Sequence, residues 1–163
     1  MLTLVPQIRH NECHIGAVLT MLSGYCENVS YKEIRKTIGG NSLADIEDCL
    51  VAHGINCNSY EFNKEKLERL DFKVMIAHVD QKISRHFIVI EKEKHDLYYY
   101  NPADYKRHIL TDKIKKGLTG YCVATKMVPN SKLVVRKPQI HFKTRFFIFA
   151  FIFNALLVLL LYS

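Results

Sequence analysis

Residues 7–22 read QIRHNECHIGAVLTML and place Gln7 six residues before Cys13, at the start of an apolar run. The run is expected to form a helix that begins at Cys13 and ends at Gly24. A thiol at a helix N-terminus lies where the positive end of the backbone dipole and the free N–H groups favour a thiolate, which lowers its pKa below the free value of about 8.5. Cys13 is therefore a candidate nucleophile.

Gln7 adds a second group to this stretch, because an amide N–H held near the sulfur can donate to a developing oxyanion. The commonest fate of a lone cysteine is nonetheless that of a small buried residue in a core helix. Position on a helix leaves both interpretations of Cys13 open, so partner residues elsewhere in the chain have to decide between them.

The C-terminal segment differs from the rest of the chain. Residues 146–162 read FFIFAFIFNALLVLLLY, apolar throughout except Asn154 and without charge. At 1.5 Å per residue a helix of this length covers about 25 Å, close to the hydrocarbon core of about 30 Å. A core helix of a globular protein is apolar along one stripe only, so we expect residues 146–163 to form a transmembrane helix.

The net charge of +7 is concentrated just before that expected helix. Up to Thr125 the chain has 17 Lys and Arg against 16 Asp and Glu, whereas residues 126–145 contain six basic residues and no acidic one. Basic residues beside a membrane span mark its cytoplasmic side and attract anionic lipid. We therefore expect a basic juxtamembrane linker at 127–145 and a cytoplasmic globular part at 1–126 that binds no nucleic acid.

Five cysteines form neither a C-x-x-C pair nor a metal-finger spacing. They are Cys13, Cys26, Cys49, Cys57 and Cys122. An odd number on the cytoplasmic side favours free thiols over a disulfide framework. The pair Gly39-Gly40 lacks the flanking pattern of a phosphate-binding loop. The sequence thus predicts no metal, no cofactor and no nucleotide site.

The first half of the chain is expected to be helical and the second half to form a sheet. Ser30 caps a short helix with the capping-box spacing to Glu33, and Ser42 opens a third helix. Polar turns then separate runs rich in β-branched and aromatic residues. This pattern predicts brief helices at 63–70 and 111–117, and strands at 74–79, 86–90, 97–100 and 120–125, with a turn at 80–85. Helices followed by an antiparallel sheet describe an α+β domain in which the Cys13 helix packs on the sheet.

A cysteine nucleophile needs a base and the base needs an orienting group, usually from distant parts of the chain. Of the eight histidines, His86 is preferred because it heads a strand directly after a polar turn, where its side chain can face a cleft. His78 lies inside a strand and is expected to be a hydrogen-bonded residue of the sheet. His10 and His14 flank Cys13 and are placed to line the site. The others fall at a helix end, in turns or in the linker, and are His53, His95, His108 and His141.

Asn101 is the candidate orienting group. The expected hairpin from Phe87 to Tyr100 returns Asn101 to the level of His86, because its two strands run antiparallel. The Asn101 side-chain oxygen can accept from one imidazole nitrogen, which leaves the other nitrogen to serve the thiol. Asn101-Pro102 taken singly is also an ordinary turn opening.

Three elements now stand in order: Gln-x5-Cys at a helix start, His86 to Ile90 after a turn, and Asn101-Pro102-Ala103 one strand later. Together they resemble the papain-like bacteriocin-processing cysteine peptidases, the double-glycine leader peptidase domains usually found at the N-terminus of bacterial ABC exporters. The resemblance covers about residues 5–126. It implies a papain-like fold, with Cys13 as nucleophile, His86 as general base, Asn101 as orienting residue and Gln7 as oxyanion donor.

Two positions depart from the pattern of that family. It usually has Gly after the cysteine, where this chain has His14, and Asp before Pro-Ala, where this chain has Asn101. The ring of His14 is expected to narrow the site or to contact substrate. Loss of a carboxylate at Asn101 is expected to stabilise the imidazolium less, while the nucleophile itself is kept.

The resemblance implies a cysteine endopeptidase on the cytoplasmic face of a bacterial cell membrane. Its substrates would be bacteriocin-like or signalling precursor peptides, cut after a Gly-Gly leader and exported by an ABC exporter. Two alternatives remain: a non-catalytic module that presents a secretion substrate to the exporter, and another papain-like acyl-transfer enzyme such as an amidase or transglutaminase. Retention of Cys13, His86 and Gln7 favours the peptidase. The sequence contains no ATP-binding motif, and the chain is either a stand-alone anchored peptidase or the front of a longer exporter.

Overall fold

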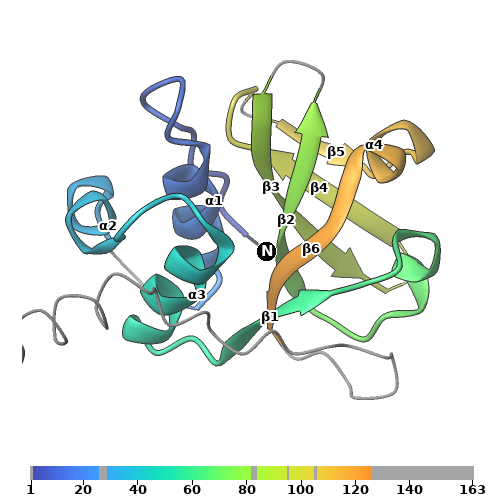
Figure 1. Ribbon diagram of the computed structural model, residues 1–163, viewed down its shortest axis with the longest axis horizontal. Coiled ribbons are helices and arrows are strands. Elements are labelled where there is room, and N and C mark those ends of the chain that lie inside the picture. The colour runs from blue at the N-terminus through green and yellow to red at the C-terminus, as the bar shows by residue number, and fades with distance from the viewer. Residues whose placement is uncertain (1, 26–28, 82–83, 95, 105, 126–163) are drawn as a thin grey trace, which may run out of the picture.

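A computed structural model describes residues 2–25, 29–81, 84–94, 96–104 and 106–125 of the chain. Three helices come first and a six-stranded antiparallel sheet follows, with the helices lying to one side of the sheet (Figure 1). The expected α+β domain is therefore confirmed. The elements are α1 (Cys13–Leu22), α2 (Tyr31–Thr37), α3 (Leu43–Ala52), β1 (Cys57–Glu61), the 3-10 helix η1 (Lys64–Arg69), β2 (Val74–Gln81), β3 (Ser84–Glu93), β4 (Asp96–Asn101), β5 (Lys106–Ile109), α4 (Asp112–Gly117) and β6 (Leu118–Thr125).

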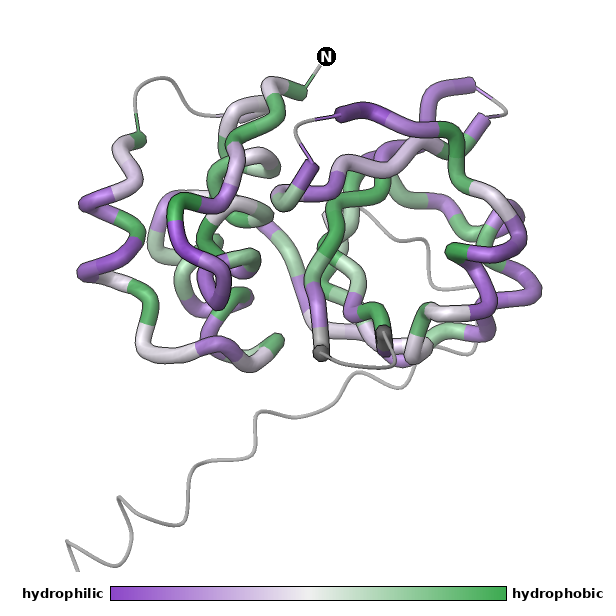
Figure 2. Tube along the Cα trace, turned by 90° about the horizontal axis from the view of Figure 1, so that it is seen from above, coloured by the Kyte–Doolittle hydropathy of each residue, from purple (hydrophilic) through white to green (hydrophobic). Residues whose placement is uncertain are grey.

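The strands lie in the order β1-β6-β2-β3-β4-β5, and every neighbouring pair is antiparallel. The central strands are buried on both faces, which explains why they read as nearly continuous apolar runs. Ile76 and Val89 belong to a cluster shared with the helices, whereas Met75 and Ile88 belong to a second cluster on the other face. Seen from above, the sheet is strongly curved and lies beside the helical layer (Figure 2).

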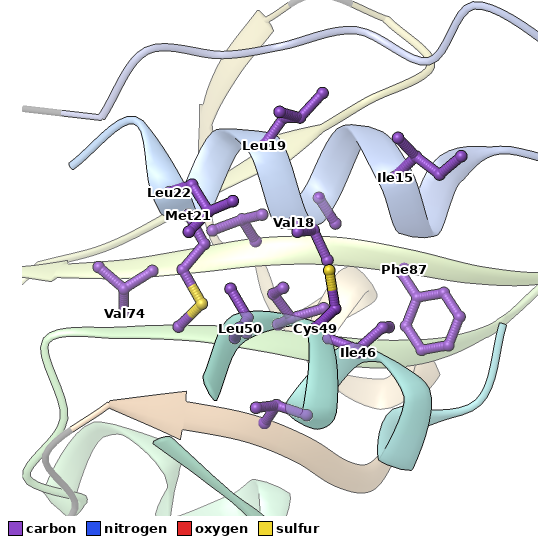
Figure 3. Packing of buried hydrophobic residues seen from close by; sticks show 14 of the residues in the cluster. Ile15, Val18, Leu19, Met21, Leu22, Ile46, Cys49, Leu50, Val74 and Phe87 are labelled. Atoms are coloured by element: carbon purple, nitrogen blue, oxygen red, sulfur yellow. The ribbon is translucent and has the colours of Figure 1, made fainter. Parts of the chain in front are cut away.

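Helix α1 is the element that joins the helical layer to the sheet. Nine of its ten residues are buried, because α2 and α3 cover one side of it and β3 the other. Figure 3 shows Val18 and Met21 of α1 extending toward Leu50 of α3, with the sheet residues Val74 and Phe87 on either side. A helix buried on nearly all sides cannot shift without opening the core, so the position of Cys13 is set by packing.

Several details differ from expectation. The predicted turn at 80–85 is too long, because cross-strand pairing continues through Asp80 with Arg85 to Gln81 with Ser84. Strands β1 and β5 were not predicted; both are short and polar, and both are edge strands, where only one side is paired. The reciprocal capping box occurs at Ser42 with Asp45 rather than at Ser30, whose side chain accepts only the Glu33 N–H.

The helices that the structure describes include none with the length and hydropathy of a membrane span. The predicted linker at 127–145 and transmembrane helix at 146–163 lie outside the described residues. Both remain predictions from the sequence.

Gly16, in the first turn of α1, is a point of close approach between three segments. A Cβ atom on Gly16 would lie 2.9 Å from the Pro102 Cβ, 3.0 Å from the Val5 carbonyl oxygen and 3.1 Å from the Gln7 nitrogen. The Gln7 N–H also donates to the Pro102 carbonyl oxygen at 3.0 Å. The absence of a side chain at Gly16 thus lets the Gln7 segment and the Asn101-Pro102 turn meet against the helix that carries Cys13.

We predict that Gly16→Ala lowers the free energy of unfolding by about 1–2 kcal/mol, although alanine is the better helix former. Two of the three atoms that the new methyl group would meet belong to the backbone and cannot rotate away. Urea denaturation of both proteins measures the difference. Gly117→Ala is the matched control, because its Cβ would meet only a Val79 methyl group closely, at 3.3 Å; equal stability of the Gly16→Ala and natural chains would contradict the prediction.

Candidate active site

Cys13 is the first residue of α1, and its side chain is buried. Glu12 stands at the N-cap but its side chain makes no capping hydrogen bond. Instead its carboxylate accepts from the Tyr31 hydroxyl at 2.9 Å and pairs with Arg35 Nε at 3.2 Å. No side chain therefore caps the helix start, and its dipole and N–H groups favour negative charge on the Cys13 sulfur.

His86 and Asn101 are joined by a hydrogen bond. His86 Nε2 lies 2.7 Å from Asn101 Oδ1, which also accepts the Ala103 N–H at 3.0 Å. Because Oδ1 only accepts, Nε2 must be the donor, and this fixes the tautomer of the neutral ring. The hydrogen bond to Cys13 is then left to Nδ1. The hairpin β3–β4 thus delivers Asn101 to His86 as the sequence predicted, although His86 is the third residue of its strand rather than the first.

The thiol and the imidazole shift each other's pKa in opposite directions. Burial raises the pKa of Cys13, but hydrogen bonds from His14, His86 and the Phe87 backbone N–H, with the charge of His86, outweigh it and bring the pKa from 9.0 to about 6. Burial lowers the pKa of His86, but its hydrogen bonds to Cys13 and Asn101 and the charges of Cys13 and Asp104 raise it above 6.5 overall. The pair favours a thiolate beside an imidazolium, the form in which a cysteine is nucleophilic near neutral pH.

The other described cysteines behave differently. Cys49, Cys57 and Cys122 are buried, and burial raises the pKa of each thiol, in Cys57 to about 12. Cys13 alone among the cysteines that the structure describes has a lowered pKa. This contrast removes the interpretation of Cys13 as a small core residue and nothing more.

Two hydrogen bonds hold Gln7 in its loop. Its amide Nε2 donates to the His10 carbonyl oxygen at 3.2 Å, and its backbone N–H donates to Pro102. Its Oε1 is buried without a hydrogen-bond partner. One amide N–H is thus used within the loop and the second remains for another acceptor. Its role as oxyanion donor stays a prediction.

His14 does more than the sequence indicated. Its side chain is half-buried and forms a hydrogen bond that lowers the pKa of Cys13, so the thiol has two imidazole partners. His14 Nδ1 is buried without a hydrogen-bond partner. The only sequence signal for this role of His14 is that it follows Cys13 directly. Adjacency in the sequence does not show whether two side chains on a helix are in contact.

Two of the remaining histidines belong to strands of the sheet, and two lie outside the described residues. His78 Nδ1 lies 3.2 Å from Thr119 Oγ1, as expected for a hydrogen-bonded residue of the sheet. His108, expected in a turn, belongs to β5, and His95 and His141 lie outside the described residues. Within the described ranges, no three His, Cys, Asp or Glu side chains converge as a metal ion would require.

We predict that alkylation of Cys13 by iodoacetamide reaches half its maximal rate near pH 6, because the reactive thiolate forms as pH rises through the lowered pKa. Mass spectrometry of the peptide that contains Cys13 measures the rate, with fragment ions separating it from Cys26. In the unfolded chain the midpoint should lie near the ordinary value of 9.0. A midpoint near 9 in the folded chain would be inconsistent with the site described above.

We predict that His14→Gly shifts this alkylation curve to higher pH and slows the reaction at pH 6 about three- to tenfold, because one hydrogen bond to the thiolate is lost. His14→Asn, which keeps an N–H donor, should lose less. Identical curves for the glycine variant and the natural chain would mean that His14 does not stabilise the thiolate.

Comparison with known proteins agrees with this arrangement. A model of the peptidase C39 family matches residues 2–130, most of the chain. A putative ABC transporter ATP-binding protein of Mycoplasma genitalium, MG390, is 29% identical over 159 residues, which cover 93% of this chain and 22% of that protein. Its homolog in Mycoplasma pneumoniae is 29% identical over 125 residues, 72% of this chain and 18% of that protein. The chain thus spans about a fifth of the length of these relatives.

Two solved structures are similar in fold. A double glycine motif protease from an AMS/PCAT transporter, in complex with its leader peptide, has a TM-score of 0.66 and 19% identity, over 77% of this chain and 93% of that one. The peptidase domain of Streptococcus ComA has a TM-score of 0.64 and 18% identity, over 77% of this chain and 100% of that one. The papain-like fold is therefore confirmed, and the chain belongs to the peptidase C39 family of cysteine peptidases.

Proposed function

We propose that the chain is an endopeptidase that cleaves precursor peptides after a Gly-Gly leader on the cytoplasmic face of a bacterial membrane, in association with an ABC exporter. The observation that carries the proposal is the pairing of Cys13, with its lowered pKa, and His86, whose ring is held by Asn101. A module that only presents substrates needs no activated thiol, so this pairing favours catalysis over the non-catalytic alternative.

The reaction would follow the thiol–imidazole route. The Cys13 thiolate attacks the carbonyl carbon of the second glycine, and an amide N–H of Gln7 donates to the oxyanion that forms. The His86 imidazolium gives its proton to the leaving amine, which leaves a thioester on Cys13. Neutral His86 then takes a proton from water, whose oxygen attacks the thioester; the leader is released as an acid, and the Cys13 thiolate is restored beside the His86 imidazolium.

The partner and the location rest on the relatives. The Mycoplasma proteins are described as putative ABC transporter ATP-binding proteins, and the AMS/PCAT protease was solved with a leader peptide. Their common feature is a transporter, which supports an exporter as the partner of this chain. The basic segment at 127–145 and the apolar segment at 146–163 support a membrane-spanning segment after the peptidase, with the peptidase in the cytoplasm.

The test incubates the full chain with peptides that carry Gly-Gly, Gly-Ala or Ala-Ala at one junction. We predict cleavage after Gly-Gly only, lowered at least about a thousandfold by Cys13→Ala, since no other group replaces the nucleophile. Activity should fall as pH drops through about 6, because the thiolate is protonated there.

Cys49→Ala is the matched control, because it removes a buried thiol that lies outside the site, and it should keep its activity. Mass spectrometry of the products identifies the bond that is cut. Binding of the Gly-Gly peptide without cleavage would favour the presenting module, and cleavage by Cys13→Ala would exclude Cys13 as the nucleophile.

A further inference from the structure

We propose that Asp104 is a positioning residue that supplies the negative charge which Asn101 lacks, and so keeps His86 in its protonated form beside the Cys13 thiolate. The inference rests on the proposed function, since it concerns the same pair of residues.

Asp104 lies in the turn after β4, and Asn101 closes this turn. The Asp104 N–H donates to the Asn101 carbonyl oxygen at 3.2 Å, and the Ala103 N–H donates to Asn101 Oδ1 at 3.0 Å. Asn101 thereby holds both the His86 ring and the turn that contains Asp104. The turn thus keeps the backbone of Asp104 hydrogen-bonded to the residue that holds the His86 ring.

The Asp104 carboxylate is itself held in place. Its Oδ1 accepts the Lys106 N–H at 3.1 Å, and its Oδ2 lies 2.9 Å from His108 Nε2. The ring of His108 stacks on Tyr99, with centroids 4.9 Å apart and planes at 22°. Although 39% of the Asp104 side chain is exposed, two partners on β5 therefore fix where its charge lies.

The charge of Asp104 acts on its surroundings. It raises the pKa of Tyr99, after the larger effect of burial, and it is among the groups that raise the pKa of His86. Its effect on His86 follows those of burial, of the hydrogen bonds to Cys13 and Asn101, and of the charge of Cys13. A charge that does not touch the ring acts through space and is partly screened by solvent, so its effect should be modest.

The test measures alkylation of Cys13 as a function of pH in the full chain. We predict that Asp104→Asn slows alkylation about two- to fivefold near pH 6 and not above pH 9, because a weaker imidazolium raises the pKa of the thiol. Asp112→Asn, which removes an exposed carboxylate from α4, is the matched control and should leave the curve unchanged.

Restoring the charge next to the ring provides a second measurement. Asn101→Asp in the Asp104→Asn background should recover the lost rate near pH 6. A curve for Asp104→Asn that superimposes on that of the natural chain, a loss equal at every pH, or no recovery in the double variant would overturn the inference. Alkylation needs no peptide substrate. Failure to cleave Gly-Gly peptides would therefore refute the proposed function, while the alkylation curves would still test the role of Asp104.

Discussion

The contact between the Cys13 sulfur and the His86 imidazole joins the two layers of the molecule. Cys13 opens a helix that is buried on nearly all sides, and His86 precedes Phe87, which packs in the same cluster as that helix. The Phe87 backbone N–H donates to the sulfur as well. The packing that stabilises the fold and the geometry that activates the thiol are therefore the same set of contacts, and a change that loosens one should weaken the other.

Gly16 and the Asn101-Pro102 turn extend this dependence to the rest of the site. The Gln7 segment, the turn and α1 meet at Gly16, which has no side chain. The same close approach therefore positions both Gln7, the candidate oxyanion donor, and Asn101, which holds the His86 ring. The two departures from the family pattern affect charge rather than placement. His14 adds a donor to the sulfur, and Asn101 keeps the hydrogen bond to His86 without a carboxylate.

Much of the site could be predicted from the sequence, because its main residues carry local signals. Cys13 opens an apolar run, and antiparallel pairing returns Asn101 to His86. Strands β1 and β5 could not be found, since edge strands need no continuous apolar pattern. The contribution of Asp104 was also missed, because only the closure of the turn reveals which charges lie near His86.

The central claim is that thiol and imidazole form an ion pair, and NMR titration of His86 tests it directly. Resonances of ring-labelled histidine, assigned with a His86→Asn variant, would be followed against pH in the natural chain and in Cys13→Ala. We expect the pKa of His86 to lie above 6.5 in the natural chain and to fall in Cys13→Ala, where the hydrogen bond and the charge of the sulfur are gone and burial remains. An unchanged pKa in Cys13→Ala would contradict the account.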